Sequence, residues 1–209
     1  MARAFKDHIT IPEKFGTVMV IEKEFGPAGA KDWAEMAKSV ANIVKVTFGT
    51  AALYDERLLK EKIAVYNDAG IATMIGGTLT EVAILNAGGY TKSALQGYLK
   101  YAKALGFTHL EFSDGSIYIP DKERPECIRM FKDAGFRVIS EVGKKDPKKD
   151  ALLTMQHRIE LMKQDLASGA EMVIIEARES GKGIGVMGKA GEVLFAELDE
   201  IVHGVGLEN

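Results

Sequence analysis

The chain has 209 residues, of which 46% are hydrophobic and 27% are charged, a balance that excludes a disordered chain and a small disulfide-stapled scaffold. The formal net charge of −3 provides no basic field for nucleic acid or for an anionic membrane surface. The only cysteine, Cys127, has no internal disulfide partner, and the sequence shows neither an export signal nor a membrane-spanning stretch, so we expect a cytoplasmic protein.

Short runs of β-branched and apolar residues alternate along the whole chain with longer amphipathic stretches, which is the pattern of βα units on a parallel sheet. The six predicted strands are residues 17–23, 42–47, 71–75, 107–113, 136–142 and 171–178. The helical period is clearest in residues 151–168, where Leu152 begins an apolar stripe and Arg158 falls on the polar side, which we expect to face solvent. At four junctions a glycine ends the helix-length stretch before the next strand begins, as a left-handed helix cap requires.

No serine- or proline-rich linker divides the chain, so we predict a single barrel-type catalytic domain over residues 1–209. Six βα units fit either an incomplete (βα)₈ barrel of the TIM type or an open doubly wound sheet, and periodicity alone does not distinguish them. The direction in which the polar strand residues point favours the barrel.

Alternate residues of a barrel strand face the helices or the interior, so the apolar residues that face the helices determine where the polar ones point. In the fourth strand, Leu110 and Phe112 take the helix side. Glu111 and Ser113 must then point inward. The same rule turns four basic and three acidic side chains inward near the carboxyl ends of their strands, where barrel active sites form. They are Lys23, Lys45, Lys145, Arg178, Glu111, Glu141 and Glu176.

Buried charges must pair, bind a metal or meet a charged ligand. For any single member of this set, a solvent-facing salt bridge is an equal alternative. One rule places all seven, however, and this favours a shared pocket of mixed sign. Such a pocket suits a small polyanion that is carried with a divalent cation.

Two glycine-rich segments follow predicted strands. Gly76-Gly77-Thr78 opens a helix whose amides suit a carboxylate or phosphate, although a plain turn capped by Thr78 is equally compatible. Residues 176–185 form a turn in which Lys182 and Gly183 are placed to hold phosphate, with a mobile hinge as the alternative.

The metal-ligand types favour magnesium over zinc. The four histidines lie in separate units without metal-ligand spacing, which argues against zinc. Carboxylates remain, and Mg²⁺ binds through one or two of them together with substrate oxygens. Asp114 is a candidate ligand, although Asp114-Gly115 is also a common turn pair.

Five segments, in order along most of the chain, resemble the phosphosulfolactate synthase family. They are Val44-Lys45 with Phe48-Gly49-Thr50, Gly76-Gly77-Thr78-Leu79 with Glu81, Glu111 to Ser116, Ser140 to Lys145, and Ile175 to Gly185. The resemblance implies a (βα)₈-barrel lyase that adds sulfite to phosphoenolpyruvate with Mg²⁺. The product would be (2R)-phospho-3-sulfolactate, an early intermediate of coenzyme M biosynthesis.

The resemblance also suggests roles for residues of this chain. It favours Lys145 as the general acid, and the strand direction independently prefers Lys145 to Lys144. The predicted catalytic set is Lys145, Glu141 and Lys45. The predicted substrate-binding set is Lys23, Arg178, Lys182, Gly76, Gly77, Thr78, Ser113 and Gly183. The predicted metal set is Glu111, Asp114 and Glu176.

The family's barrel has eight units and this chain contains six, which leaves alternatives open. An unclosed sheet exposes two edges, so either a partner chain covers the gap, the sequence is a fragment of a longer chain, or the fold closes differently. Of these, we expect a homo-oligomer. A noncatalytic relative that acts as a stress-associated or scaffolding protein is one alternative function. A Schiff-base aldolase that uses Lys45 or Lys145 is the other.

Overall fold

The fold is that of a computed structural model, which describes residues 16–206. Six parallel strands form one sheet in the order β1-β2-β3-β4-β5-β6. Each predicted strand is present, although each is shorter than predicted at one or both ends. The strands are β1 (Met19–Glu22), β2 (Ile43–Val46), β3 (Ala72–Ile75), β4 (His109–Phe112), β5 (Arg137–Val142) and β6 (Met172–Ile175).

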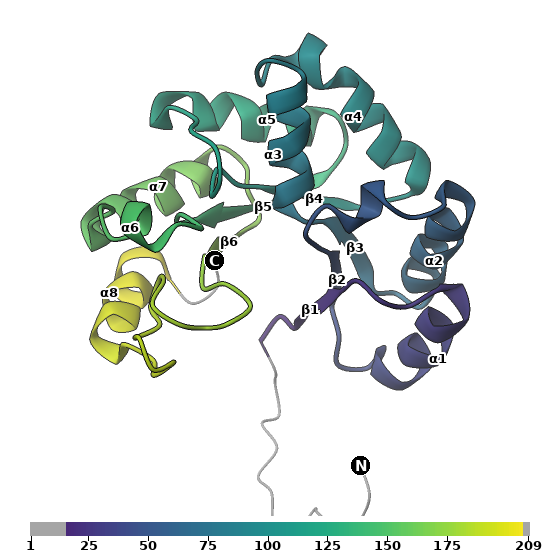
Figure 1. Cartoon of the computed structure of the whole chain (residues 1–209), viewed down its shortest axis with the longest axis horizontal. Coiled ribbons are helices and arrows are strands. Elements are labelled where there is room, and N and C mark those ends of the chain that lie inside the picture. The colour runs from purple at the N-terminus through teal and green to yellow at the C-terminus, as the bar shows by residue number, and fades with distance from the viewer. Residues whose placement is uncertain (1–15, 207–209) are drawn as a thin grey trace, which may run out of the picture.

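This strand order decides between the two predicted architectures. A doubly wound sheet reverses its strand order near the middle, whereas a barrel adds each strand beside the one before it. Here every strand pairs with its sequence neighbour, and the sheet curls into a half-barrel with the helices around its outside (Figure 1). The predicted incomplete barrel is therefore confirmed, with β1 and β6 as the two edge strands.

Helices connect and cover the strands. They are α1 (Pro27–Ala37), α2 (Glu56–Asp68), α3 (Gly77–Asn86), α4 (Lys92–Leu105), α5 (Arg124–Asp133), α6 (Pro147–Asp150), α7 (Met155–Ala167) and α8 (Phe195–Val205), with short 3₁₀ turns at Thr50–Ala52 and Asp121–Glu123.

The helix predicted over residues 151–168 begins later than expected. The side chain of Thr154 accepts a hydrogen bond from the amide of His157 and caps α7 at its first turn. Leu152 therefore lies before the helix, where it is 80% exposed. The apolar spacing alone extended the prediction across this cap.

The two faces of the sheet follow the predicted alternation. The outward-facing side chains of Val46, Leu110 and Phe112 pack into a large core with the helices. On the inner face, Ile43, Met74 and Ile139 form a separate apolar cluster. Because this cluster fills the amino-terminal part of the half-barrel, the polar residues further along the strands are left at the carboxyl ends.

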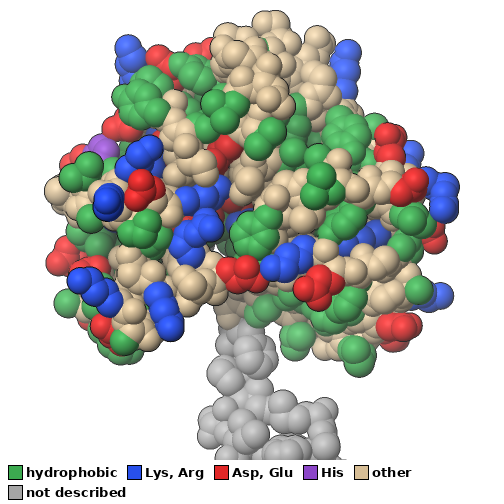
Figure 2. All heavy atoms as spheres, viewed as in Figure 1, with side chains coloured by type: hydrophobic (Ala, Val, Ile, Leu, Met, Phe, Trp, Pro, Cys, Tyr) green, Lys and Arg blue, Asp and Glu red, His purple; other side chains and the backbone are tan. Residues whose placement is uncertain are grey.

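Four further points concern the membrane, charge, cysteine and export-signal predictions. Within residues 16–206, no helix has both the length and the apolar character needed to cross a membrane. Figure 2 shows acidic and basic side chains mixed over one face of the molecule. Cys127 is buried in α5, and this burial raises the pKa of its thiol to about 12, which makes the thiol unreactive. Residues 1–15, where we expect no export signal, lie outside the described part of the chain.

Candidate functional site

A cavity of about 170 Å³ lies at the carboxyl ends of the strands, inside the curl of the sheet. Apolar side chains of β1 and β6, including Ile21 and Ile174, form part of its wall. Six of the seven charged residues predicted to point inward line it. They are Lys45, Glu111, Glu141, Lys145, Glu176 and Arg178. Gly77 and Thr78 also line it.

Lys45 lies between two carboxylates. Its ammonium forms an ion pair with Glu111, and it lies 3.6 Å from Oε2 of Glu141. Burial alone would lower the pKa of Lys45, but the charges of Glu111 and Glu141 raise it, so Lys45 stays charged. Burial, together with the charge of Glu111, raises the pKa of Glu141 well above its ordinary value, against the opposing effect of Lys45. The site therefore contains a carboxyl group that retains its proton more readily than an exposed glutamate.

The glycine pair at the start of α3 allows close packing around these charges. The amide of Gly77 donates a hydrogen bond of 3.0 Å to Oε1 of Glu111. A Cβ on Gly77 would lie 2.1 Å from Oγ of Ser113 and 2.7 Å from Oε1 of Glu111, and a Cβ on Gly76 would lie 3.3 Å from Cε of Lys45. The sequence predicts that the glycines let another group approach the backbone closely. The structure shows such an approach, and the approaching groups are the side chains of Lys45, Glu111 and Ser113.

Lys145 enters the cavity from the segment after β5. Its ammonium donates hydrogen bonds of 3.1 Å to Oγ1 of Thr78 and 3.1 Å to Oε1 of Glu81. Thr78 therefore contacts Lys145 and does not cap α3, whose N-cap residue is Gly76. Ser113 lies behind this pair, because its hydroxyl donates a hydrogen bond of 2.6 Å to Oε1 of Glu81.

Glu81 contacts Lys145 and is absent from the predicted site residues. It is 2% exposed and accepts bonds from both sides of the site. The segments that resemble the family include it, but helical spacing gives no sign that a turn after β4 and a lysine after β5 converge on its carboxylate.

Glu176 and Arg178 form the side of the cavity that follows β6. Oε1 of Glu176 accepts a hydrogen bond of 2.7 Å from the amide of Arg178, whose φ of 54° lies in the left-handed region. Nη1 of Arg178 lies 3.9 Å from Oε2 of Glu176, and the side chain is 36% exposed. The guanidinium is thus loosely held at the mouth of the cavity, where it is accessible to an anion.

Asp114 lies apart from this cavity. Its Oδ1 accepts a hydrogen bond of 2.9 Å from Arg124, and its Oδ2 forms an ion pair with Lys144. Among residues 16–206, no three or more histidine, cysteine or acidic side chains are grouped to hold a metal ion. The predicted trio of Glu111, Asp114 and Glu176 is therefore not assembled as one site, because the carboxylate of Asp114 is occupied by two cations.

Five of the eight predicted substrate-binding residues also lie outside the cavity lining. Gly76 and Ser113 lie directly behind it, beside Lys45 and Glu81. The other three are Lys23, Lys182 and Gly183. Lys23 follows β1 and forms an ion pair of 2.8 Å with Glu179, which follows β6. Lys182 lies beside Gly191 and does not line this cavity. It also does not line a larger cavity beside α6. Gly183 lines that larger cavity.

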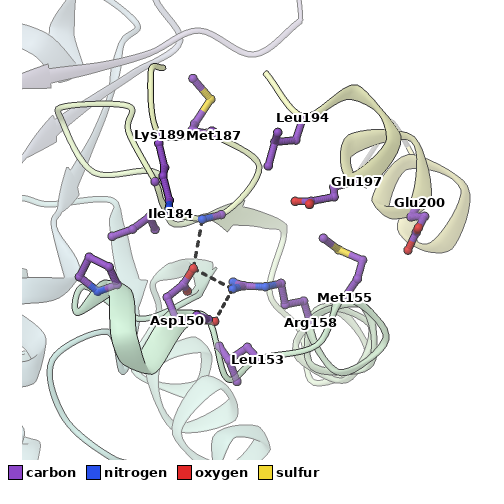
Figure 3. Close-up of a pocket in the computed structure, with 15 residues that line it drawn as sticks. Asp150, Leu153, Met155, Arg158, Ile184, Met187, Lys189, Leu194, Glu197 and Glu200 are labelled. Atoms are coloured by element: carbon purple, nitrogen blue, oxygen red, sulfur yellow. Dashed lines mark hydrogen bonds and ion pairs between the residues drawn. The ribbon is translucent and has the colours of Figure 1, made fainter. Parts of the chain in front are cut away.

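The larger cavity, of about 510 Å³, lies between α6, the start of α7 and the segment that leads to α8 (Figure 3). Asp150 forms its base, where it accepts hydrogen bonds of 2.8 Å from the amide of Lys144 and 3.1 Å from the amide of Gly185. Nη2 of Arg158 lies 2.8 Å from Oδ2 of Asp150. The prediction that Arg158 faces solvent is wrong, since this pairing buries it to 4% exposure.

Sequence comparison places the chain among known enzymes. The profile of the (2R)-phospho-3-sulfolactate synthase (ComA) family matches residues 6–209. A phosphosulfolactate synthase from Methanothermobacter thermautotrophicus is 39% identical over 197 residues, which are 94% of this chain and 74% of that protein. A phosphosulfolactate synthase from Methanocaldococcus jannaschii is 42% identical over 192 residues, which are 92% of this chain and 74% of that protein. The chain thus spans about three quarters of the length of these relatives.

Solved structures share the fold at low sequence identity. A phosphonopyruvate hydrolase in complex with oxalate and Mg²⁺ superposes with a TM-score of 0.57 and 14% identity over 88% of this chain and 62% of that one. The 3-hexulose-6-phosphate synthase of Salmonella typhimurium superposes with a TM-score of 0.56 and 13% identity over 90% of this chain and 74% of that one. At this identity the likeness supports the barrel-type fold alone.

Proposed function

Because the chain belongs to the (2R)-phospho-3-sulfolactate synthase family, we propose that it adds sulfite to phosphoenolpyruvate to form (2R)-phospho-3-sulfolactate. The observation that carries this proposal is the cavity in which Lys45, Lys145 and Arg178 meet three glutamates. Both substrates are small anions, and a cavity with three cationic side chains suits them. The chemistry requires charge stabilisation and one proton transfer, and the cavity contains groups for both.

In the proposed reaction, the sulfur lone pair of sulfite forms a bond to the methylene carbon of phosphoenolpyruvate. The electrons of the carbon–carbon double bond move toward the substrate carboxylate, which becomes an enediolate. Lys45, kept protonated by its two carboxylate neighbours, is suited to stabilise that developing charge. Arg178, at the mouth of the cavity, is suited to bind the phosphate or the incoming sulfite.

The reaction ends when a proton reaches the second carbon of the substrate, and we assign this proton to Lys145. Two of its three ammonium N–H groups have acceptors, Thr78 and Glu81, in the structure. A third N–H remains to face a substrate in the cavity. Glu141, whose pKa is raised, is suited to return a proton to the site between turnovers.

Magnesium fits the oxygen ligands of this cavity. Glu111 and Glu141 are close enough for the charge of one to raise the pKa of the other, and Glu176 adds to the same effect. Because Glu141 is assigned to proton return, Glu111 and Glu176 are the two carboxylates that would hold Mg²⁺ together with substrate oxygens. Bound there, Mg²⁺ would supply stabilisation of negative charge on the substrate carboxylate. Asp114 is not part of this proposed site.

We test the proposal by mixing the purified protein with phosphoenolpyruvate, sulfite and Mg²⁺ and following loss of the enol absorbance. Lys145→Ala is expected to lower kcat by roughly 10² to 10⁴, the usual contribution of a general acid. Lys148→Ala, on the exposed side of α6, is the matched control and should leave kcat unchanged. A folded wild-type protein that consumes no phosphoenolpyruvate would overturn the proposal in favour of a noncatalytic role. A cytoplasmic location and a homo-oligomer are parts of the same proposal.

A further inference from the structure

We propose that Glu81 is a positioning residue that holds the ammonium of Lys145 in the cavity and leaves one of its N–H groups free for the substrate. This inference rests on the proposed function, because it assigns a purpose to the placement of Lys145. Glu81 itself does not line the cavity, so it acts through Lys145 and does not contact the substrate directly.

Lys145 is held along its whole length. Its amide donates a hydrogen bond of 3.0 Å to the carbonyl of Gly115. Its alkyl chain lies against the same glycine, where an added Cβ would be 3.1 Å from both Cγ and Cε of Lys145. At the tip, Thr78 and Glu81 accept two N–H groups, and Nζ has no other partner within residues 16–206. A long side chain that ordinarily samples many rotamers is thereby confined to one direction.

Glu81 is in turn fixed from the opposite side. Its Oε1 accepts hydrogen bonds from the hydroxyl of Ser113 at 2.6 Å and from the amide of Gly115 at 3.1 Å. Its Oε2 accepts a hydrogen bond of 3.0 Å from the amide of Ser116. Burial alone would raise the pKa of Glu81, but these donors and Lys145 lower it, so the group is a carboxylate at neutral pH.

This arrangement connects three elements at one point. α3 contributes Glu81, the turn after β4 contributes three donors, and the segment after β5 contributes Lys145. A carboxylate that only shaped the turn would be satisfied by Ser113, Gly115 and Ser116. The additional bond to Lys145 pairs the buried carboxylate with a cation and fixes the direction of the ammonium.

A double-mutant cycle on the full chain separates positioning from a structural role. We expect Glu81→Gln to lower kcat about 100-fold, as misplacement of a reacting group by about 1 Å does. In Lys145→Ala, adding Glu81→Gln should cause no further loss, because the residue that it positions is already gone. Glu61→Gln, an exposed glutamate on α2, is the control for the same chemical change. Losses that multiply in the double variant would overturn the proposal.

A second measurement does not depend on turnover. Acetylation of Lys145 by acetic anhydride at one fixed pH, quantified by peptide mass spectrometry, reports how firmly its amine is held by its hydrogen-bond acceptors. We expect Glu81→Gln to increase Lys145 acetylation, because the amine loses one of its two acceptors, and Glu61→Gln to leave it unchanged. Unchanged acetylation in Glu81→Gln would overturn the proposal.

The two measurements also distinguish the two proposals. A wild-type protein without turnover defeats the proposed function, whereas the acetylation measurement still decides whether Glu81 holds Lys145. If Glu81→Gln does not fold by circular dichroism, Glu81→Asp takes its place in both experiments. Glu81→Asp keeps the charge and withdraws it from Lys145, so it should show the same changes to a smaller extent.

Discussion

At the scale of single residues, burial and neighbouring charge decide which protonation state each titratable group adopts. Inside the half-barrel, at the carboxyl ends of the strands, the surrounding groups keep Lys45 charged and favour a proton on Glu141. At the amino end of the same interior, His109 is 2% exposed and points toward Arg137 and Glu171. The pKa of His109 is lowered and that of Glu141 is raised, so these two groups change the folding stability in opposite directions as pH changes.

Burial, followed by the charge of Arg137, lowers the pKa of His109 to about 4. Glu171 lies 3.9 Å from Nε2 of His109, but its carboxylate is paired with Arg137 and does not offset these effects. The unfolded chain therefore binds more protons than the folded chain between pH 6.5 and 4, and stability falls as pH falls through that window. We predict that the wild-type protein loses about 2 kcal/mol between pH 7.5 and 5 through this group, and that His109→Gln avoids the loss.

Urea unfolding of both proteins at pH 7.5 and pH 5 checks this prediction. The raised pKa of Glu141 has the opposite sign, because stability falls as pH rises through it, but it is common to both proteins and cancels in the comparison. Equal acid sensitivity in the wild-type protein and in His109→Gln would show that His109 is not the responsible group.

The close approach at Gly77 gives a second prediction for a single residue. An alanine Cβ there would overlap Oγ of Ser113 and Oε1 of Glu111, so Gly77→Ala should cost about 1–3 kcal/mol and displace Glu111 from Lys45. Gly97, exposed in α4 with no heavy atom within 4 Å of an added Cβ, is the matched control. Gly97→Ala should stabilise the protein by about 0.5–1 kcal/mol. Thermal unfolding of the two variants is the measurement, and shifts in the same direction would contradict the prediction.

At the scale of the elements, hydrophobic patterning predicted the six strands and the side to which their residues point. Local apolar periodicity suffices for this, because burial against helices requires it at every strand. The predicted ends of the strands are less accurate. β6 ends at Ile175, whereas the sequence pattern predicts a strand that continues to Arg178. The extension failed because the backbone turns into a left-handed conformation at Arg178, held by Glu176.

Contacts between distant segments were not predictable in this way. Arg158 was assigned to a solvated face because helical spacing carries no information about Asp150, which precedes the helix and turns back onto it. Asp114 and Glu81 were similarly indistinguishable in sequence, since both are acidic residues near glycine-containing turns. Only the fold shows that Arg124 engages the first and Lys145 the second.

Asp150 connects the segment after β5 to the segment after β6, although these are far apart in the sequence. We therefore predict that its substitution loosens both segments. It accepts hydrogen bonds from the amides of Lys144, after β5, and Gly185, after β6. It also pairs with Arg158 (Figure 3). Asp150→Asn removes the charge beside a buried arginine, so we expect a loss of about 3–5 kcal/mol. Hydrogen exchange should rise first in the segments around residues 143–145 and 183–185.

Asp199→Asn, an exposed substitution on α8, is the control and should change neither stability nor exchange. Faster exchange spread evenly over the chain in Asp150→Asn would contradict a local connecting role. Retained stability would contradict the pairing itself.

At the scale of the whole molecule, the sheet of the described residues ends in two strands that each pair on one side only. The four residues of β6 are all half-buried, and Ile21 of β1 is 46% exposed on the inner face. The ion pair between Lys23 and Glu179 joins the segments after these two strands at the mouth of the half-barrel. Along the strands themselves, backbone groups and apolar side chains remain open to a further strand or a second molecule.

Open edges of this kind promote pairing between chains, so we predict that the 209-residue chain self-associates in solution. Ile21→Lys places a charge on the exposed inner edge and should shift the protein toward the monomer in sedimentation velocity, with an unchanged circular dichroism spectrum. Leu85→Lys, at a 64% exposed position on α3, is the control for a general loss of apolar surface. If the edge is the interface, only Ile21→Lys weakens association. Equal weakening by both variants would assign association to scattered apolar contacts, and a monomeric wild-type protein would mean that the edges are protected within one chain.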